Sequence, residues 1–313
     1  MRNILLLLLL SLRITEMLGQ GRVVSWNVEN LFDCRHDTLK DDHEFLPDGS
    51  QHWTPYRYRA KLDNVARTIA SLTAEDRWPS LVGLCEVEND SVLYDLTRRS
   101  PLRAARYAYV MTDSPDRRGI DVALLYEPSD FRLLDYQCIR VPSEEQGLRP
   151  TRDILHAWGI FRGCDTLHVL VVHLPSRASR SQESSKNRLL AAQTLSSVVD
   201  TLCDKDVLIM GDFNAEQGDP VFKNLTPPFH SLTPRAPSSP SEAEGSYNFR
   251  DRWCFLDHIL VSPRLLPRCV SQAHVASPPF LLNEDGKPFR TYAGPRYMGG
   301  YSDHLPLWVD IKP

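Results

Sequence analysis

The sequence has few cysteines, and none of them are closely spaced. Its seven cysteines are an odd number, scattered from position 34 to position 269, and no two are separated by only two residues. The scatter argues against a disulfide framework, and the missing spacing excludes a zinc knuckle or a dithiol redox motif. We therefore expect several of the cysteines to be small buried hydrophobes, with at most one incidental disulfide.

An overall basic charge that would attract nucleic acid is also missing. The net charge is −4, and only seven of the 36 basic residues are lysines, which leaves 29 arginines. Arginine binds phosphate through two parallel hydrogen bonds, so a local phosphate-binding groove is still compatible with this charge. Codon bias explains the arginine excess equally well. The hydrophobic and charged fractions, 42% and 24%, are ordinary for a globular protein.

A long apolar run occurs at the N-terminus. Arg2 precedes the run Ile4–Leu10, and Gly19 is a small residue of the kind found near cleavage sites. This pattern predicts a signal peptide over residues 1–20, a domain over 21–313, and a periplasmic or secreted protein. Arg13 interrupts the apolar stretch, so an N-terminal amphipathic helix is the alternative. The stretch is short for a membrane span, and we expect no stable span after its removal.

Apolar runs and helical periodicities alternate along the rest of the chain. The predicted strands are Arg22–Val28, Leu81–Val87, Ile120–Tyr126, Phe131–Ile139, Leu167–His173, Val207–Met210, Phe255–Val261 and Leu305–Ile311. Apolar residues at helical spacing predict helices over Tyr56–Leu72 and Ser181–Leu202. The mixture indicates an α/β protein with more than one sheet. Two proline-rich segments, Thr226–Gly245 and Ser277–Gly300, are predicted to be long loops.

Polar residues cluster at the ends of several predicted strands. They are Asn27 and Glu29, Glu86, His173, Asp212 and Asn214, Asp257, and the run Ser302-Asp303-His304. Ligands of open α/β sheets bind beyond the carboxyl ends of the strands. Each signal alone fits a turn, a cap or a buried histidine. Together they supply the oxygen ligands, base, amide and histidine that magnesium-assisted phosphoryl transfer needs.

This ordered set resembles the endonuclease/exonuclease/phosphatase superfamily, which includes deoxyribonuclease I, abasic-site endonucleases, neutral sphingomyelinases and inositol polyphosphate 5-phosphatases. The motifs Gly211-Asp212-Phe213-Asn214 and Ser302-Asp303-His304 carry the resemblance, which runs from about Arg22 to the C-terminus. The segments Trp53–Arg59 and Tyr292–Tyr301 look like a less characterised bacterial branch. The resemblance implies one α/β domain, a four-layer αββα sandwich of two packed mixed sheets of the deoxyribonuclease I type.

The resemblance also implies a role for each motif residue. The implied metal-binding residues are Glu86 as the principal carboxylate, Asn27 and Asp303 as supporting groups, and Glu29 less directly. The implied catalytic residues are Asp212 as the base, Asn214 as an orienting amide, Asp257 and His304 as a dyad, and His173 at the phosphate. Hard oxygen ligands favour Mg²⁺ or Mn²⁺. Arg118 either contacts substrate or is a solvated turn residue.

These features predict a metal-dependent enzyme that hydrolyses phosphodiesters, with nucleic acid as the expected partner. A phosphatase or phospholipase acting on inositol phosphates or sphingomyelin is the alternative. A catalytically inactive binding module on the same scaffold is a third interpretation, but such a module has no need for the complete set of site residues. We expect the protein to act as a monomer.

Overall fold

Two six-stranded sheets form the centre of the molecule. The computed structural model describes residues 19–313 except 178–181, 224, 226–228, 235 and 237–242. The first sheet has the order β13 (His274–Val275), β16 (Leu307–Ile311), β1 (Gly21–Leu31), β2 (Leu81–Val87), β4 (Asp121–Tyr126) and β3 (Ala108–Met111). The second has the order β5 (Phe131–Ile139), β6 (Ile154–Phe161), β7 (Thr166–His173), β8 (Asp206–Asp212), β12 (Asp257–Val261) and β9 (His230–Ser231).

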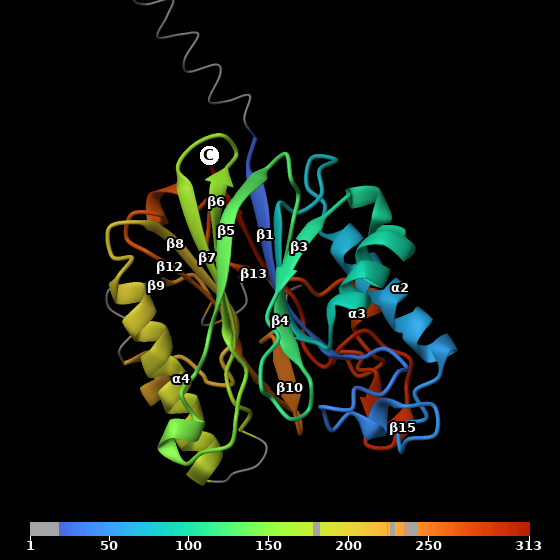
Figure 1. The fold of residues 1–313 in the computed structure, drawn as a ribbon. Coiled ribbons are helices and arrows are strands. Elements are labelled where there is room, and N and C mark those ends of the chain that lie inside the picture. Colours follow the sequence, from blue (N-terminus) through green and yellow to red (C-terminus); the bar gives the residue numbers. More distant parts are fainter. Residues whose placement is uncertain (1–18, 178–181, 224, 226–228, 235, 237–242) are drawn as a thin grey trace, which may run out of the picture.

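Helices cover the outer face of each sheet. Figure 1 shows α2 (Pro55–Ser71) and α3 (Asp90–Tyr94) outside the first sheet, and α4 (Gln182–Asp200) outside the second. Helix α2 begins with a proline, and the Thr54 hydroxyl before it accepts a hydrogen bond from the Arg57 amide, an arrangement that satisfies the helix N-terminus. The result is a four-layer αββα sandwich, which confirms the predicted fold class.

Several short hairpins and helical turns lie outside the two main sheets. Two small hairpins, β10 (Tyr247–Phe249) with β11 (Arg252–Cys254) and β14 (Tyr292–Ala293) with β15 (Arg296–Tyr297), lie outside the main sheets. The turns of 3₁₀-helix are η1 (His43–Phe45), η3 (Pro101–Ala105), η4 (Glu144–Gln146), η5 (Pro220–Phe222), η6 (Leu266–Arg268) and η7 (Pro279–Leu281), and one π-helical turn, η2, spans Asp95–Arg99. The predicted loop Ser277–Gly300 therefore contains η7 and the β14–β15 hairpin.

The main hydrophobic core lies between the two sheets. Its members include Cys85 of β2, whose Sγ atom contacts the Val172 carbonyl oxygen, and Val171 and Met210 of the second sheet, all buried. Gly83 of β2 allows the sheets to approach closely, because a Cβ there would lie 2.8 Å from the Met210 Cε atom. A smaller cluster between α4 and the second sheet fills the outer layer.

Two parallel strand pairs place polar residues at one end of the sandwich. Strands β1 and β2 are parallel, as are β7 and β8, and every other strand pair in the two main sheets is antiparallel. Each parallel pair is connected through a helix, α2 or α4, so its carboxyl ends meet at one edge. Gly211 is required near the end of β8, because a Cβ would lie 1.9 Å from the Val172 carbonyl oxygen.

Most predicted elements are present with shifted ends. Strand β8 extends to Asp212, two residues beyond the predicted strand, whereas β6 and β3 were not predicted. All seven cysteines are free thiols; Cys85 is buried, but Cys138, Cys164 and Cys203 are exposed, so the prediction of several buried cysteines is wrong for these three. Most of the predicted signal peptide, residues 1–18, lies outside the described residues. Among the residues that the structure describes, no helix has the length and apolar character needed to cross a membrane.

Candidate active site

Two carboxylates from different sheets share one amide. Asn27 of β1 donates its Nδ2 group to Glu86 Oε1 at 3.3 Å and to Asp212 Oδ2 at 3.1 Å. The Asn30 backbone amide donates to the second oxygen of Glu86 at 2.9 Å. The Asn27 side-chain oxygen accepts the Glu29 backbone amide at 2.9 Å. Asn27 therefore holds the predicted metal carboxylate and the predicted base side by side.

Asp257 and His304 form a buried, hydrogen-bonded pair. Asp257 lies opposite Asp212 in the β8–β12 register, and its Oδ2 atom is 2.7 Å from His304 Nδ1. Ser302 fixes the turn before His304, since its hydroxyl donates to the Asn27 carbonyl oxygen at 2.7 Å and accepts the His304 amide at 3.0 Å. Burial alone would lower the pKa of His304, but the Asp257 carboxylate raises that pKa well above its usual value. His304 is therefore held as an imidazolium.

His173 faces the same two carboxylates, Glu86 and Asp212, but it is a neutral imidazole, whereas His304 is an imidazolium. Its Nε2 atom lies 3.6 Å from Asp212 Oδ2 and 3.9 Å from Glu86 Oε1. Burial, reinforced by the positive charges of Arg152 and Arg118, lowers the pKa of His173 well below its usual value. A neutral imidazole and an imidazolium thus flank Asp212, because His304 Nε2 is 3.8 Å from the same Asp212 oxygen.

Asp212 is poised to exchange a proton near neutral pH. Burial raises the pKa of Asp212 to about 7; the charge of Asp257 adds to this rise, and that of His304 opposes it. A carboxylate with a pKa near the working pH can act as a general base. Asp212 is only 2% exposed, so its carboxylate is shielded from bulk water.

The backbone around the site adopts left-handed conformations at four residues that are not glycine. The φ angles are 53° at Glu29, 52° at Asn30, 66° at Glu86 and 48° at Asn214. Such conformations cost on the order of 1–3 kcal/mol each and gather at functional sites. At Asn214 the turn directs the backbone amide to Asp212 Oδ1 at 2.8 Å, while the side-chain amide donates to the Leu174 carbonyl oxygen at 2.9 Å. At Asn30 and Asn214 the left-handed turns therefore accompany backbone amides that bind the two carboxylates.

Glu29 and Asp303 lie in an ionic network beside this centre. Glu29 Oε2 accepts the Thr291 backbone amide at 2.6 Å and is 4.0 Å from Lys61 Nζ. Arg290 donates to Asp303 Oδ2 at 2.7 Å and approaches Glu29 Oε1 at 4.0 Å. The predicted metal residues are thus divided: Glu86 and Asn27 lie at the centre, and Glu29 and Asp303 contact cations of this chain.

Lys61 is a buried charge that the sequence prediction missed. Its side chain is 1% exposed and donates to Thr291 Oγ1 and to the Tyr301 carbonyl oxygen, each at 2.6 Å. Burial lowers the pKa of Lys61 to about 8, with the nearby charge of Glu29 opposing the shift. Burial likewise raises the pKa of Glu29 to about 7. The sequence contained one signal for this burial, because Lys61 lies beside Leu62 on the apolar face of α2.

Two arginines support the opposite side of the site. Arg152 is buried; it donates to the His173 carbonyl oxygen at 3.2 Å and to Asp116 Oδ2 at 3.1 Å. Arg118 donates to the Asn30 side-chain oxygen at 2.6 Å, next to the amide that binds Glu86. Arg118 is thus an exposed turn residue, one of the two predicted alternatives, and its contact with Asn30 places it at the edge of the site.

The match to a family model covers almost the entire described chain. Residues 22–313 match the model of the endonuclease/exonuclease/phosphatase family. The chain belongs to this family. Members of the endonuclease/exonuclease/phosphatase family are phosphoric ester hydrolases, and the match supports an enzyme of this class. No curated protein matches the sequence.

Solved structures agree with the family at the level of the fold. A functionally unknown conserved protein from Enterococcus faecalis is 18% identical with a TM-score of 0.60, over 93% of this chain and 100% of that one. Humanized TDP2 from D. rerio is 16% identical with a TM-score of 0.61, over 94% and 99%. The human Nocturnin catalytic domain with bound sulfate is 17% identical with a TM-score of 0.56, over 93% of both chains.

Members of the endonuclease/exonuclease/phosphatase family commonly use divalent metal ions, and the residues present fit one. Asp212 and Asp257 offer carboxylate oxygens that lie within 4.8 Å of each other, whereas His304, as an imidazolium, has no lone pair for a metal ion. Glu86 adds a further carboxylate beside Asp212, and among the described residues Asp257 Oδ1 has no hydrogen-bond partner. Carboxylate oxygens are the donors that Mg²⁺ and Mn²⁺ prefer.

Proposed function

We propose that the chain is a metal-dependent phosphodiesterase, with Mg²⁺ or Mn²⁺ held through Glu86 and supported by Asn27 and Asp303. The observation that carries the proposal is Asp212, a buried carboxylate placed between an imidazolium and a neutral imidazole, next to Glu86. When bound, the metal would act as a Lewis acid on a phosphoryl oxygen. Glu29 is a less direct candidate for the metal site, because its carboxylate already contacts Lys61 and Thr291.

Each side chain of the site then has a separate role in hydrolysis. Asp212 accepts a proton from the attacking water, which its pKa of about 7 allows. The Asn214 side-chain amide, held by its hydrogen bond to the Leu174 carbonyl oxygen, orients groups at the phosphate. The imidazolium of His304, held by Asp257, donates a hydrogen bond to a phosphoryl oxygen as charge develops there. His173 is neutral and contacts phosphate without adding charge.

Nucleic acid is the substrate that we favour. A D. rerio TDP2 structure described as complexed with single-strand DNA product is 17% identical to this chain, with a TM-score of 0.58. In this chain Arg118 and Arg290 lie on two sides of the acidic centre, where phosphates next to the scissile bond would need positive charge. We also propose that the protein is exported and acts in the periplasm or outside the cell, because of the apolar run at its start.

Paired substrates test the proposal. With Mg²⁺ present, bis-p-nitrophenyl phosphate is compared with p-nitrophenyl phosphate, and plasmid DNA with an inositol polyphosphate. We expect cleavage of the diester and of DNA, both abolished by EDTA. Strong monoester turnover without any diester cleavage would contradict the hypothesis that the chain is a nuclease, and would assign it to the phosphatases of the family. The matched inactive control is Asp212→Asn, which keeps the shape of the side chain.

A further inference from the structure

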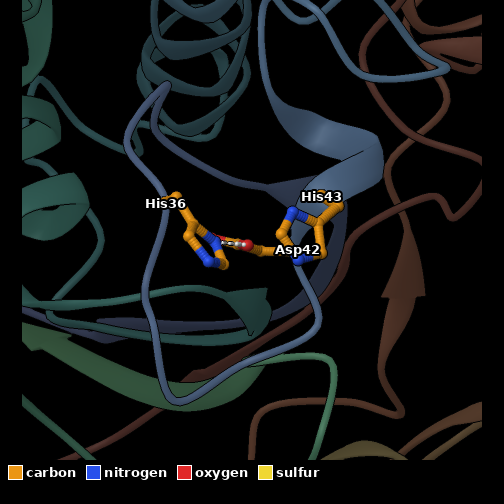
Figure 2. Close-up of side chains that lie close together, drawn as sticks. All are labelled: His36, Asp42 and His43. Carbon is orange, nitrogen blue, oxygen red and sulfur yellow. Dashed lines mark hydrogen bonds and ion pairs between the residues drawn. The ribbon is translucent and has the colours of Figure 1, made fainter.

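A second group of metal-ligating side chains lies outside the hydrolytic site. His36, Asp42 and His43 come from the segment that follows β1 and enters η1, and Figure 2 shows their side chains close together. One ligand atom from each lies within 4.8 Å of the others. None of the three contacts Glu86, Asp212 or His304 through a hydrogen bond or ion pair among the described residues.

The carboxylate of this group is buried and fixed. Asp42 is 1% exposed, and its Oδ2 atom accepts the Asp37 backbone amide at 2.8 Å. Its Oδ1 atom lies 2.5 Å from His36 Nδ1. The His43 ring stacks on the His36 ring, with 4.3 Å between ring centroids. Two imidazoles and one carboxylate therefore meet without any rearrangement of the backbone.

The scaffold under these residues is rigid. Phe45, two residues after His43, stacks on Phe32 with ring centroids 4.3 Å apart. Trp53 packs against Phe45 and donates its indole N–H to the Phe32 carbonyl oxygen at 2.9 Å. All three aromatic residues are buried together with Ile120. A ligand set held on such a cluster loses little conformational freedom when an ion binds.

The surroundings carry an excess of negative charge. Segment 33–44 contains five acidic residues and two basic ones, and the Lys40 ammonium is bonded to the Ser114 carbonyl oxygen at 2.5 Å. Glu88 is buried, and burial raises its pKa to about 8, with the charges of Asp33 and Asp42 adding to the rise. A cation at Asp42 would relieve this repulsion.

We propose that His36, Asp42 and His43 bind a second divalent cation, of the zinc type. Two imidazole nitrogens and one carboxylate suit Zn²⁺, Ni²⁺ or Cu²⁺, whereas the oxygen-rich hydrolytic site suits Mg²⁺. Three protein ligands leave a fourth position for water. His43 lines an open hollow of about 560 Å³, which gives solvent access to that position. The hollow is also lined by Arg118, so this cation would support the edge of the hydrolytic site.

Zinc binding to the full chain tests this site. The background carries Glu86→Gln and Asp212→Asn, so that the hydrolytic site binds the ion weakly or not at all. After EDTA treatment and desalting, Zn²⁺ is titrated by calorimetry, and the melting temperature is recorded with and without Zn²⁺. We expect one equivalent to bind and the melting temperature to rise, because an ion that binds only the folded state stabilises it.

Substitutions in the segment then locate the ion. His43→Ala removes an exposed ligand, and His36→Gln removes a second one; each should raise the Kd for Zn²⁺ at least ~10-fold and abolish the thermal shift. The control is His52→Asn, an exposed neighbour with a φ of 47°, which asparagine tolerates. Unchanged binding in His43→Ala and His36→Gln, an equal loss in His52→Asn, or no binding to the background would each overturn the proposal. In that case the contact between His36 and Asp42 is a hydrogen bond that closes the loop.

Discussion

Removing the Lys61 ammonium should destabilise the fold strongly. Lys61→Met deletes two hydrogen bonds of 2.6 Å and leaves the Glu29 carboxylate, 4.0 Å away, without its buried partner. Breaking one side of a buried ion pair costs about 3–5 kcal/mol of unfolding free energy. We expect a loss of this size at pH 7.5, where Glu29 with its pKa of about 7 is mostly ionised and Lys61 with its pKa of about 8 is mostly protonated.

A double-mutant cycle separates the charge from the packing. In Lys61→Met the Glu29 carboxylate keeps only Arg290, 4.0 Å away, as a cationic neighbour among the described residues. Adding Glu29→Gln removes that carboxylate, so the double variant should recover about 1–3 kcal/mol relative to the sum of the single effects. Urea unfolding followed by tryptophan fluorescence measures all four proteins. Lys205→Met is the control, since Lys205 pairs with Asp204 at the surface and should change stability by less than about 0.5 kcal/mol.

The pH dependence of the cycle has a definite sign. Glu29 has a raised pKa in the folded state, so below pH 7 the native protein binds a proton that the unfolded chain binds only near pH 4.5. Protonation of Glu29 removes the buried carboxylate charge. The unfolding free energy lost in Lys61→Met should therefore be smaller at pH 5.5 than at pH 7.5. Effects that add within about 0.5 kcal/mol, or a loss of equal size at both pH values, would refute the reasoning.

Four further outcomes are expected. Asp212→Asn should lower kcat at least ~10²-fold on bis-p-nitrophenyl phosphate while the circular dichroism spectrum is retained, because it removes only the proton acceptor. Glu86→Gln should raise the Mg²⁺ concentration needed for half-maximal rate, and a wild-type rate at low Mg²⁺ would show that the ion is held elsewhere. His258 is fully buried, and burial lowers its pKa from 6.5 to about 4. Between these values the unfolded chain binds the extra proton, so His258 costs about 2 kcal/mol of stability at pH 5, and the stability gap between wild type and His258→Gln should shift by that amount between pH 7 and pH 5. Mass spectrometry of the exported protein should find an N-terminus near residue 21, and an intact Met1 would contradict export with cleavage.

The sequence predicted those strands whose apolar residues form an unbroken run along the chain. Unbroken apolar runs such as Leu81–Val87 became strands buried on both faces. Strand β6 was missed because His156 and Gly159 interrupt its apolar run, although the residues fit between β5 and β7. Short elements such as β3 depend on neighbouring strands for their hydrogen bonds, and a local pattern does not contain that information.

Residues that depend on distant contacts could not be predicted. Lys61 looks like an ordinary helix residue until the segment around Thr291 and Tyr301 folds over it. The left-handed backbone at Glu29 and Glu86 has no local signal, because glutamate does not favour that conformation. Burial favours the neutral form of both His173 and His304; Arg152 adds to that effect at His173, whereas Asp257, from a separate part of the chain, overrides it and raises the pKa of His304.

The close approach of Gly83 to Met210 lies between β2 and β8, the two strands that carry Glu86 and Asp212. Gly83 lies three residues before Glu86, and Met210 lies two residues before Asp212, so the strands that touch at this contact are the strands that carry the two carboxylates. Neither half of the sandwich carries both acids. A methyl group added at Gly83 would displace the end of the Met210 side chain, so core packing and the placement of the two acids depend on the same two strands.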